Sequence, residues 1–534
     1  MAHVLDDLDA RGLIAHSTDP DALRSALSAG PITFYVGFDP TAPSLHIGNL
    51  LQILTARRLQ LAGHKPLLLV GGSTGLVGDP KEAGERVMNA KETVAEWVDR
   101  IRTQVSAFVD LEGPSAATMV NNLDWTAGLS TIDFLRDIGK HFPVNRMLAR
   151  DVVSSRLEAG ISYTEFSYVL LQSLDYLELH RRYGCVLQTG GSDQWGNITA
   201  GVELIRRADG DKVHALATPL ITKADGTKFG KTESGTVWLD PELTSPYAFY
   251  QSWIQAEDSK VGEYLRQFTF LEVSEIETIV TEHLEKPGLR AAQRRLAAEV
   301  TALVHGDAEA EAAATASRAL FGLAELAELP KSTLGAALQE AGTAELAGPV
   351  RPTVVDALVA TGLAESRSAA RRTVLEGGAY VNNVRVTDPD LVLDGEQLLH
   401  EALVVLRKGK RSVSGVSVQG TFELKKTSSG QYHFNLKSGN GRILLASEMY
   451  ETKAAAIAAI ELLRQEAADA EVPVVGGSRF ELKKTKSGQF HFNLKAPNGQ
   501  IILASEMYES KDAALSGIES VRRNSGDSPL ADLT

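Results

Sequence analysis

The sequence predicts an α/β protein of several domains, and three observations lead to this expectation. Over the first 220 residues, short apolar runs alternate with amphipathic segments, which is the pattern of strands covered by helices. From about residue 244 to 329 the chain is rich in alanine and glutamate and shows only helical spacing. With 534 residues, the chain is also too long for one domain of ordinary size.

In the first domain, expected over residues 1–220, three short apolar strands each run into a turn, and a helix follows the first and the third of these turns. The first strand begins at Thr33 and its helix begins near Ser44, the second strand covers 66–70, and the third covers 185–187. A helix start offers unpaired N–H groups and a partial positive charge. The turns that open a helix are therefore candidate sites for anionic ligands.

Four further units are expected after the first domain, and two of them precede the C-terminal part. Residues 221–330 hold a lysine-rich loop and a helical domain. Residues 350–412 are typical of helix, turn, helix and a strand that enters an Asn-Asn turn, with a basic run at the end. Residues 413–419 are small and weakly patterned, so we expect a linker there.

The C-terminal part contains one sequence twice. The stretch that begins FELKKTSSGQYHFNLK at Phe422 returns without a gap as FELKKTKSGQFHFNLK at Phe480. In each copy, alternating apolar and polar runs are separated by Ser-Gly or Asn-Gly turns, and an amphipathic helix follows, over residues 453–464 in the first copy. We therefore expect two small α+β repeats, at 420–466 and 478–525, each with a three-stranded sheet closed by a helix.

Composition and charge exclude several classes of protein. Hydrophobic residues make up 43% and charged residues 23% of the chain, as in soluble globular proteins. Apolar runs such as 66–70 are far shorter than the roughly 20 residues of a membrane helix. The acidic N-terminus is unlike a secretory signal, and the single cysteine, Cys185, excludes internal disulfides and a cysteine-rich zinc site. We expect a cytoplasmic protein without membrane contact.

The net charge of −14 disfavours indiscriminate binding to nucleic acids. Any nucleic acid would have to be held on local basic patches, while the acidic remainder of the chain repels wrong contacts. The informative features are therefore clusters of basic residues, not the overall charge.

The first motif lies where the turn after the Thr33 strand enters its helix. His46 and Asn49 are three residues apart on one face of the first helical turn, and both can donate hydrogen bonds to a phosphate. Gly48 leaves room for a flat ring to approach. The alternative is that His46 and Asn49 only cap the helix.

The second motif is the loop from Ile221 to Thr232, which contains three lysines and three threonines. Such a density of lysines suits a polyphosphate, and a solvated basic loop is the alternative. The ending Gly230-Lys-Thr also occurs in the Walker A loop GxxxxGK[ST]. That pattern requires glycine at position 225, where this chain has Asp225, so a P-loop is disfavoured.

The segments HIGN and KFGKT together resemble the paired HIGH and KMSKS signatures of class I aminoacyl-tRNA synthetases. Over about residues 1–410 the chain resembles bacterial tyrosyl-tRNA synthetases. The stretches that carry this resemblance are YVGFDPTAPSLHIGN, LVGGSTGLVGDP, RDIGKHFPVNRML, TEFSYVLLQSLDYLEL, QTGGSDQWGNI and PLITKADGTKFGKT. Asn49 replaces the second signature His, and Phe229 and Gly230 replace the Met and the first Ser. The resemblance implies a Rossmann-like catalytic domain, a helical domain and an S4-like RNA-binding α+β domain at 350–412.

The resemblance implies that tyrosine is the amino-acid substrate. Tyr35 and Asp175 can flank a phenolic hydroxyl as donor and acceptor, and a buried pair of this kind rejects phenylalanine. Tyr168, Gln172 and Asp175 fall at spacings of four and three, so one helix face carries all three side chains, although an ordinary polar helix surface is the alternative. The expected tyrosine-site residues are Tyr35, Asp79, Tyr168, Gln172, Asp175 and Gln194, with Asp79, Tyr168 and Gln172 on the ammonium group.

The same resemblance implies an ATP site and a set of catalytic residues. The ATP-binding residues are Gly37, Asp39, Gly48, Gly191, Asp193 and Lys231, with Asp193 on the ribose hydroxyls or, alternatively, at a helix N-cap. The catalytic residues are His46, Asn49, Thr41, Lys228, Lys231, Thr232 and Arg86. Because the tyrosine carboxylate is already ionised, the reaction needs no general base, and catalysis comes from positioning and from neutralising charge on the phosphates. Mg²⁺ is expected to travel with ATP, and no metal held by the protein is expected.

The second reaction step passes the tyrosyl group to the 3′ end of tRNA(Tyr), which the S4-like module is expected to hold. A homodimer is also expected from the resemblance. Any single arginine of the module could instead be part of a solvated face. The expected RNA-binding residues are Arg367, Arg371, Arg372, Arg407, Lys408, Lys410 and Arg411.

The two repeats resemble a family of small tandem α/β domains, and typical tyrosyl enzymes end before them. Their lysines and aromatic residues could form a nucleic-acid surface, but strict alternation favours aromatics that pack the sheet and lysines that guard its edges. In that case Tyr432 and Phe434 share one face and His433 points the other way. Two functional alternatives stay open for the whole chain: a tryptophan-specific relative, and a non-catalytic RNA-binding protein on a synthetase scaffold.

Overall fold

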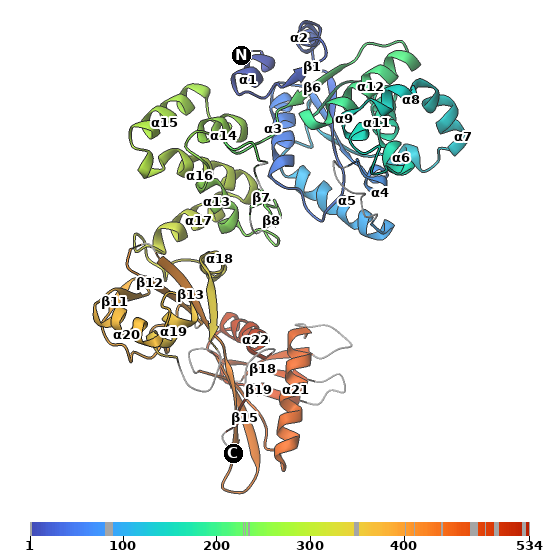
Figure 1. Ribbon diagram of the computed structural model, residues 1–534. Coiled ribbons are helices and arrows are strands. Elements are labelled where there is room, and N and C mark those ends of the chain that lie inside the picture. Colours follow the sequence, from blue (N-terminus) through green and yellow to red (C-terminus); the bar gives the residue numbers. More distant parts are fainter. Residues whose placement is uncertain are drawn as a thin grey trace. The chain divides into compact units, whose positions relative to one another are not determined.

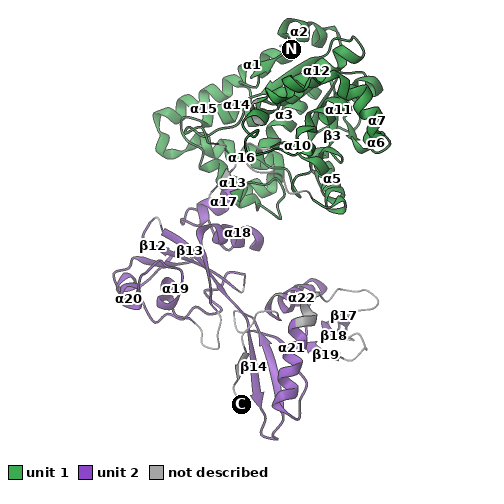
Figure 2. Cartoon of the chain, turned by 45° about the vertical axis from the view of Figure 1, so that its right-hand side comes forward, with its two compact units in different colours: residues 1–311 green, residues 312–534 purple. Residues whose placement is uncertain are grey.

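The structure is a computed structural model that forms two compact units, residues 1–311 and 312–534 (Figure 2). It describes residues 3–80, 89–227, 229, 231–232, 235–346, 352–400, 402–410, 412–438, 442–469, 479–485, 487–495, 501–525 and 530–532. No helix in these described segments is both long and apolar enough to cross a bilayer.

The first unit is built on a six-stranded sheet in the order β1-β6-β5-β2-β3-β4 (Figure 1). Strands β2 to β6 pair in parallel with their neighbours, and only β1 joins antiparallel. The strands are β1 His16–Ser17, β2 Thr33–Phe38, β3 Lys65–Val70, β4 Thr118–Asn121, β5 Cys185–Gly191 and β6 His214–Thr218. This confirms the Rossmann-like α/β domain. The strand order changes direction between β2 and β5, and ligands bind at the carboxyl ends of strands that flank such a point.

Helices pack against this sheet, and the most buried of them is α3 (Ile47–Leu61). It is buried on nearly all sides because it contacts β2, β3 and β5 and also helix α14 of the helical region. The other helices of the domain are α1 Val4–Ala10, α2 Pro20–Ala29, α4 Thr74–Val77, α5 Lys91–Ser106, α6 Leu123–Thr126, α7 Thr131–Asp133, α8 Val144–Leu148, α9 Asp151–Ser154, α10 Tyr163–Phe166, α11 Tyr168–Tyr183 and α12 Trp195–Ala208.

The helical region predicted from its composition is present. Its helices are α13 Pro246–Ile254, α14 Val261–Phe268, α15 Val273–Glu285, α16 Ala291–His305 and α17 Asp307–Ala319. The buried aromatic side chains of Phe249, Trp253, Tyr264 and Phe268 contact one another and form its centre. The boundary between the two units falls within α17, upstream of the expected domain end at residue 330.

The second unit begins with an α+β module on a five-stranded sheet in the order β11-β10-β12-β13-β9. The predicted helix, turn, helix and strand are α19 Val354–Ala360, α20 Arg367–Leu375 and β10 Ala379–Val381. Asn382 and Asn383 have φ of 47° and 68°, so they form the expected two-residue turn into β11 (Val384–Val386). The module also includes α18 Lys331–Ala341, β9 Thr343–Leu346 and β12 Leu403–Lys408.

The prediction of a linker at residues 413–419 was wrong. These residues form most of β13 (Ser412–Val418), which pairs with β12 on one side and with β9 on the other. Val416 and Val418 are buried, and Gly415 lies so close to the Leu338 side chain that a Cβ atom would not fit. The residues of this segment are therefore small because neighbouring side chains pack closely against it, and not because the segment is a solvated linker.

The two repeats contain the predicted elements, but they share a single sheet. The strand order is β17-β18-β19-β16-β15-β14-β20, and β16 pairs with β19 between the copies. Phe422 and Phe434 of the first copy and Phe480 and Phe492 of the second belong to one hydrophobic core. The elements are β14 Thr421–Lys426, β15 Tyr432–Lys437, β16 Ile443–Ala446, α21 Lys453–Asp469, β17 Arg479–Lys484, β18 Phe490–Lys495, β19 Ile501–Ser505, α22 Lys511–Ser525 and β20 Leu530–Asp532.

Candidate active site

The predicted substrate residues gather at the carboxyl ends of β2, β3 and β5 and on helices α3 and α11. Asp39 follows β2, Gly71 to Thr74 follow β3, and Gly191 ends β5. Helix α11 begins at Tyr168 and presents residues of its first two turns toward these strand ends. The site therefore lies where the strand order of the sheet predicts a ligand.

Asp175 lies at the innermost part of this region, and its side chain is almost completely buried. The residue is 1% exposed and accepts hydrogen bonds from Asn122 Nδ2 (3.0 Å) and Trp125 Nε1 (2.8 Å). Burial raises the pKa of Asp175 to about 8, against the lowering effect of those two donors. A buried carboxylate with two donors already in place is suited to accept one more hydrogen bond from a polar ligand.

Tyr35, on β2, lies in the same buried cluster as Trp125. Its hydroxyl is buried and has no hydrogen-bond partner among the described residues. Burial raises the pKa of this phenol well above its usual range, and the nearby Asp175 carboxylate raises it further. Trp125 donates to Asp175 and belongs to the same cluster as Tyr35, so both side chains lie in one buried region.

A second group of hydrogen bonds surrounds Tyr168. The Tyr168 hydroxyl donates to Asp39 Oδ2, and Thr74 Oγ1 donates to Asp39 Oδ1 at 2.6 Å. Gly71 passes so close to Asp39 and Thr74 that any side chain there would collide with them. Asp39, expected at the nucleotide end of the site, thus lies against the residue that was expected to hold the substrate ammonium group.

Tyr168 lies among several acidic groups. Burial raises its pKa well above the usual value, and Asp39, Asp79 and Asp175 raise it in turn. The Asp79 carboxylate accepts hydrogen bonds from Gln194 Nε2 (2.9 Å) and Asn197 Nδ2 (3.1 Å). Within the described residues, the buried carbonyl oxygen of Gln172 has no partner. Carboxylates and one unpaired carbonyl are the groups that bind an ammonium ion well.

His46 and Asn49 form a capping box at the start of α3. Asn49 Oδ1 accepts from the His46 backbone N–H (3.1 Å), and His46 Nδ1 accepts from the Gly48 backbone N–H (3.0 Å). Capping, the alternative to a phosphate contact, is therefore realised. It also fixes the tautomer: because Nδ1 accepts, the proton is on Nε2.

The lysine-rich loop is anchored to the helical region. The ring of Phe229 contacts Trp253 and Tyr264, with centroids 5.1 and 4.6 Å apart, and the Tyr264 hydroxyl donates to the Thr222 carbonyl at 2.9 Å. Lys231 and Thr232 form the short strand β7, which pairs with β8 (Gly235–Thr236), but their side chains lie outside the described part. Lys228 and Arg86 also lie outside the described residues.

The segment that follows this loop pairs directly with the HIGN segment. The Leu239 N–H donates to the Leu45 carbonyl (2.8 Å), and the Ile47 N–H donates to the Val237 carbonyl (3.3 Å). Between these two bonds, His46 pairs with Trp238, and their rings lie 6.3 Å apart. The chain just after the lysine-rich loop therefore lies against the start of α3.

Asp193 is exposed and has no hydrogen-bond partner among the described residues. Helix α12 begins at Trp195 with Gln194 as its N-cap, so Asp193 is not the cap. A Cβ atom at Gly191 would come within 2.5 Å of Asp193 Oδ1, so a side chain there would push this carboxylate aside. Gly37 lies on β2, and Thr41 is exposed in the turn that follows it.

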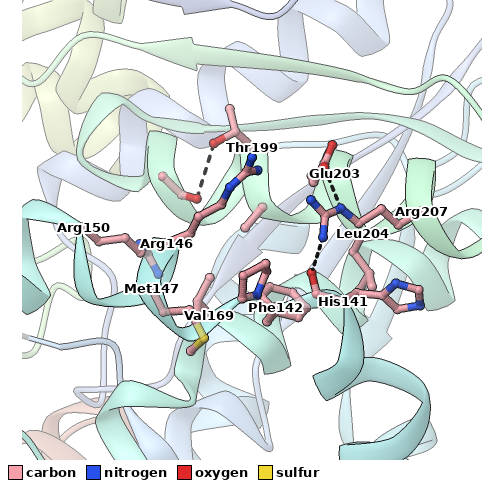
Figure 3. A pocket seen from close by; sticks show the side chains of 13 residues that line it. His141, Phe142, Arg146, Met147, Arg150, Val169, Thr199, Glu203, Leu204 and Arg207 are labelled. Atoms are coloured by element: carbon pink, nitrogen blue, oxygen red, sulfur yellow. Dashed lines mark hydrogen bonds and ion pairs between the residues drawn. The ribbon is translucent and has the colours of Figure 1, made fainter.

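A separate cavity of about 320 Å³ lies beside α8, α11 and α12 (Figure 3). Its lining includes Arg146, Arg150 and Arg207, and it contains none of the predicted site residues. Arg150 donates to Asn197 Oδ1, and Asn197 also donates to Asp79. The cavity is therefore linked to the Asp79 side of the substrate region by one chain of hydrogen bonds.

Sequence reasoning missed Asn122, Trp125, Thr74 and Asn197, which hold the acidic groups of the site. The sequence could have identified two of them, Thr74 and Asn122. They follow the strands β3 and β4, at the same edge of the sheet as Asp39. Trp125 and Asn197 lie on helices and have no local signal, so only the fold identifies them.

In the S4-like module the predicted basic residues separate into two groups. Arg372, Lys408 and Lys410 are exposed, and Arg367 and Arg371 are exposed but paired with Asp356 and Asp390. Arg407 differs from its expected role: it is only 9% exposed, donates to the Phe321 carbonyl (3.0 Å) and stacks on Tyr380. Arg411 lies outside the described residues.

Comparison with known protein families covers nearly the whole chain. Residues 27–322 match the family described as tRNA synthetases class I (W and Y). Residues 337–414 match the tyrosine–tRNA ligase SYY-like C-terminal domain. Residues 428–473 and 486–532 match a domain of unknown function, DUF1508, which corresponds to the two repeats.

Individual relatives agree with these family matches. The chain is 62% identical over 419 residues to a tyrosine–tRNA ligase of Kineococcus radiotolerans, a match that covers 78% of this chain and 99% of that one. It is 60% identical over 423 residues to one of Streptomyces avermitilis, with 79% and 100% covered. A crystal structure of a C-terminally truncated mitochondrial tyrosyl-tRNA synthetase from Aspergillus nidulans matches with a TM-score of 0.55 and 31% identity, over 60% of this chain and 95% of that one.

Proposed function

Since the chain belongs to the tyrosine–tRNA ligase family of class I tRNA synthetases, we propose which of its own residues carry the two steps of that reaction. The enzyme activates tyrosine with ATP to tyrosyl-adenylate and pyrophosphate, and then transfers the tyrosyl group to the 3′ end of tRNA(Tyr). The observation that supports the assignment is the pairing of Leu45 to Ile47 with Val237 to Leu239, because it fixes the chain that leaves the lysine loop beside His46.

Tyrosine binds with its phenol between Tyr35 and Asp175 and its ammonium group near Tyr168. The Asp175 carboxylate accepts from the substrate hydroxyl, and the unpaired Tyr35 hydroxyl completes the pair. The carboxylates of Asp39 and Asp79, together with the Gln172 carbonyl, balance the ammonium charge. Phenylalanine lacks the hydroxyl and would leave two buried polar groups unpaired, which costs about 1–3 kcal/mol for each group.

The first step needs no proton transfer from the amino acid, because the tyrosine carboxylate attacks the α-phosphate as an anion. His46 Nε2–H donates to the phosphates from the start of α3, where the helix also supplies partial positive charge. Lys228, Lys231, Thr232 and Arg86 add cationic and hydroxyl groups around the leaving pyrophosphate. Asn49 acts indirectly: its oxygen holds the His46 backbone, so it is a positioning residue for the imidazole.

The remaining ATP contacts are assigned to Gly37, Thr41, Gly48, Gly191 and Asp193. Asp193 binds the ribose hydroxyls, which its exposed and unpartnered carboxylate supports. Mg²⁺ arrives with ATP as part of the substrate. The reaction is placed in the cytoplasm, where a single buried free thiol, Cys185, is stable without disulfide pairing.

The tRNA is assigned to the exposed basic residues of the S4-like module, Arg367, Arg371, Arg372, Lys408 and Lys410, on an otherwise acidic chain. Arg372 and Lys410 have no ion pair within the described part of the module and are the strongest of these candidates. Arg407 is left out because its guanidinium is used inside the module.

Tyrosine-dependent ATP–pyrophosphate exchange tests the function itself. With the purified full chain, we expect exchange with tyrosine, and less than about 1% of that rate with phenylalanine or tryptophan, since each misses the Asp175 hydrogen bond. Faster exchange with tryptophan would favour the tryptophan-specific alternative. No exchange with any amino acid would favour the non-catalytic RNA-binding alternative.

The homodimer is supported by a run of exposed apolar side chains between residues 132 and 163. These side chains are 38% to 69% exposed, and a concentration of this kind marks a protein interface. They are Ile132, Leu135, Val144, Leu148, Leu157 and Tyr163.

Charge introduced into this run is expected to separate the subunits. In light scattering after size exclusion, the wild-type chain should have about twice the monomer mass, and the double variant Val144→Asp, Tyr163→Asp should have the monomer mass. Burying an unpaired carboxylate in an apolar interface is too costly for the dimer to persist. Leu323→Asp, at an equally exposed leucine outside the run, is the matched control. A monomeric wild type would contradict the proposal.

A further inference from the structure

The shared sheet of the two repeats has one face covered by helices and one open polar face. Phe422 and Leu424 of β14 and Phe434 and Leu436 of β15 point into the core with α21 and α22. The alternate residues of the same strands therefore lie on the opposite face. Among them is His433, whose side chain is on the face opposite to that of Phe434, as the sequence pattern predicted.

The open face has a pseudo-two-fold axis. Ala446 of the first copy pairs directly with Ala504, the equivalent residue of the second copy. On either side of this alanine pair the same groups follow in register. The row across the sheet runs Glu481, Asn493, Ala504, Ala446, Asn435, Glu423.

The polar groups beside the alanines lack partners. Asn435 is 9% exposed and Asn493 is 6% exposed, and neither side chain makes a hydrogen bond within the described residues. In the same part of the structure, the buried Nδ1 atoms of His433 and His491 also have no partner. Ala446 and Ala504, by contrast, are exposed, so the centre of the face is open to a ligand.

Each copy also carries more positive than negative charge on this face. Glu423 lies between Lys437 (2.8 Å) and Lys425 (3.1 Å), and the second copy repeats this geometry around Glu481 at the same distances. Two ammonium groups for each carboxylate leave a net positive charge on both sides of the axis. The chain as a whole has a net charge of −14, so this is a local basic surface on an acidic protein.

We propose that this open face binds the sugar–phosphate backbone of a double-helical RNA segment, and that its occupant is the tRNA of the enzyme. This inference rests on the proposed function, which supplies tRNA as the RNA partner. Ammonium, amide and imidazole groups bind phosphate and ribose oxygens. The phenylalanine and tyrosine rings of these strands lie on the other face, so unpaired bases would find no such ring to stack on.

The symmetry of the face fits a duplex. The two strands of a double helix are related by two-fold axes, so a two-fold protein surface can offer the same groups to both strands. With a strand spacing of about 4.8 Å, β15 and β18 lie about 14 Å apart, and each carries one lysine on this face, Lys437 and Lys495.

The connection to the S4-like module is short and fixed. Only Gln419 and Gly420 separate β13 from β14, and no side chain fits at Gly420 beside Asn524. The Gln419 N–H donates to the Leu346 carbonyl (3.1 Å), and the Gly420 N–H donates to Asn524 Oδ1 (3.0 Å). The repeats therefore follow the tRNA-binding module without a free linker.

The test uses the full chain and a tRNA(Tyr) transcript. In the quadruple variant Lys425→Gln, Lys437→Gln, Lys483→Gln, Lys495→Gln, we expect the Kd for the transcript to rise roughly tenfold and the salt dependence of log Kd to flatten by about 2 to 4 in slope. The matched control is Lys426→Gln, Lys484→Gln, on the same strands but packed over Tyr432 and Phe490; it should leave the Kd unchanged.

Two further measurements separate the possible outcomes. Pyrophosphate exchange without tRNA should be the same in the wild type and in the quadruple variant. If the wild type shows no exchange, the proposed function is refuted, and the RNA-binding surface is still tested by the Kd. Lysine acylation of the wild type should show protection of Lys437 and Lys495 by the transcript, even if the variant folds poorly. An unchanged Kd and salt slope in a folded variant, or no protection in the wild type, would overturn the proposal.

Discussion

Replacement of Asp175 by asparagine is expected to lower kcat/KM for tyrosine about 100-fold in pyrophosphate exchange. Leaving buried polar groups without their partners costs about 1–3 kcal/mol for each group, and each 1.4 kcal/mol is a factor of ten. The asparagine amide also cannot accept from both Trp125 and Asn122, so one buried donor loses its partner. The activity with phenylalanine should change little, and the preference for tyrosine should fall by nearly the whole factor.

Tyr35→Phe is the matched variant for this prediction. It removes a neutral hydroxyl from the same pocket, so kcat/KM for tyrosine should fall only about tenfold. If Asp175→Asn remains within threefold of wild type while Tyr35→Phe loses more activity, the carboxylate is not the principal contact of the substrate hydroxyl.

The pH dependence of stability shows whether Asp175→Asn has altered the intended group. Burial raises the pKa of Asp175 from its ordinary value of 3.8 to about 8, so the folded state binds a proton more tightly than the unfolded state. Such a group stabilises the protein below pH 3.8, and this contribution is lost as the pH rises through about 8. From about pH 4 to about pH 8, the melting temperature of the wild type should therefore fall relative to Asp175→Asn. A constant difference between the two would show that Asp175 is ionised throughout this range.

Replacement of His46 by alanine is expected to slow the formation of tyrosyl-adenylate by roughly 10²–10³-fold, with little change in KM for tyrosine. Removing one donor that stabilises charge in a transition state has effects of this size. Stopped-flow measurement of the first turnover isolates this step from tRNA transfer.

Asn49→Ala is the control for the helix cap. It removes the bond from the His46 backbone to Asn49 Oδ1 but keeps the imidazole, so it should cost about 1 kcal/mol, or about fivefold in rate. Equal small effects of His46→Ala and Asn49→Ala would mean that His46 serves only as a cap.

Much of the fold followed from local patterns. The helix start at the HIGN segment, the repeat and the Asn382-Asn383 turn depend on residues close together in the sequence, and the structure confirms these elements at the expected places. The Tyr168, Gln172, Asp175 face of α11 also followed from helical spacing alone. Such features are predictable because neighbouring residues determine them.

The features that depend on tertiary partners were not predictable. From the sequence, segment 413–419 is predicted to be a linker. In the structure Leu338 and Thr343 pack against Gly415, and the segment is a strand of the sheet. From the sequence, Arg407 is predicted to contact RNA. In the structure its guanidinium instead lies over Tyr380 and donates to the Phe321 carbonyl. The two repeats look independent because nothing local indicates that β16 pairs with β19. In each case the deciding contact comes from a separate part of the chain.

The central claim is that the imidazole of His46 and the ammonium group of Lys231 act on the same triphosphate. A double-mutant cycle with His46→Ala and Lys231→Ala, measured on the first-turnover rate of tyrosyl-adenylate formation, tests it most directly. Groups that act together on one transition state should show a coupling energy of at least about 1 kcal/mol. Effects that add to within about 0.3–0.5 kcal/mol would show two independent sites and would contradict the claim.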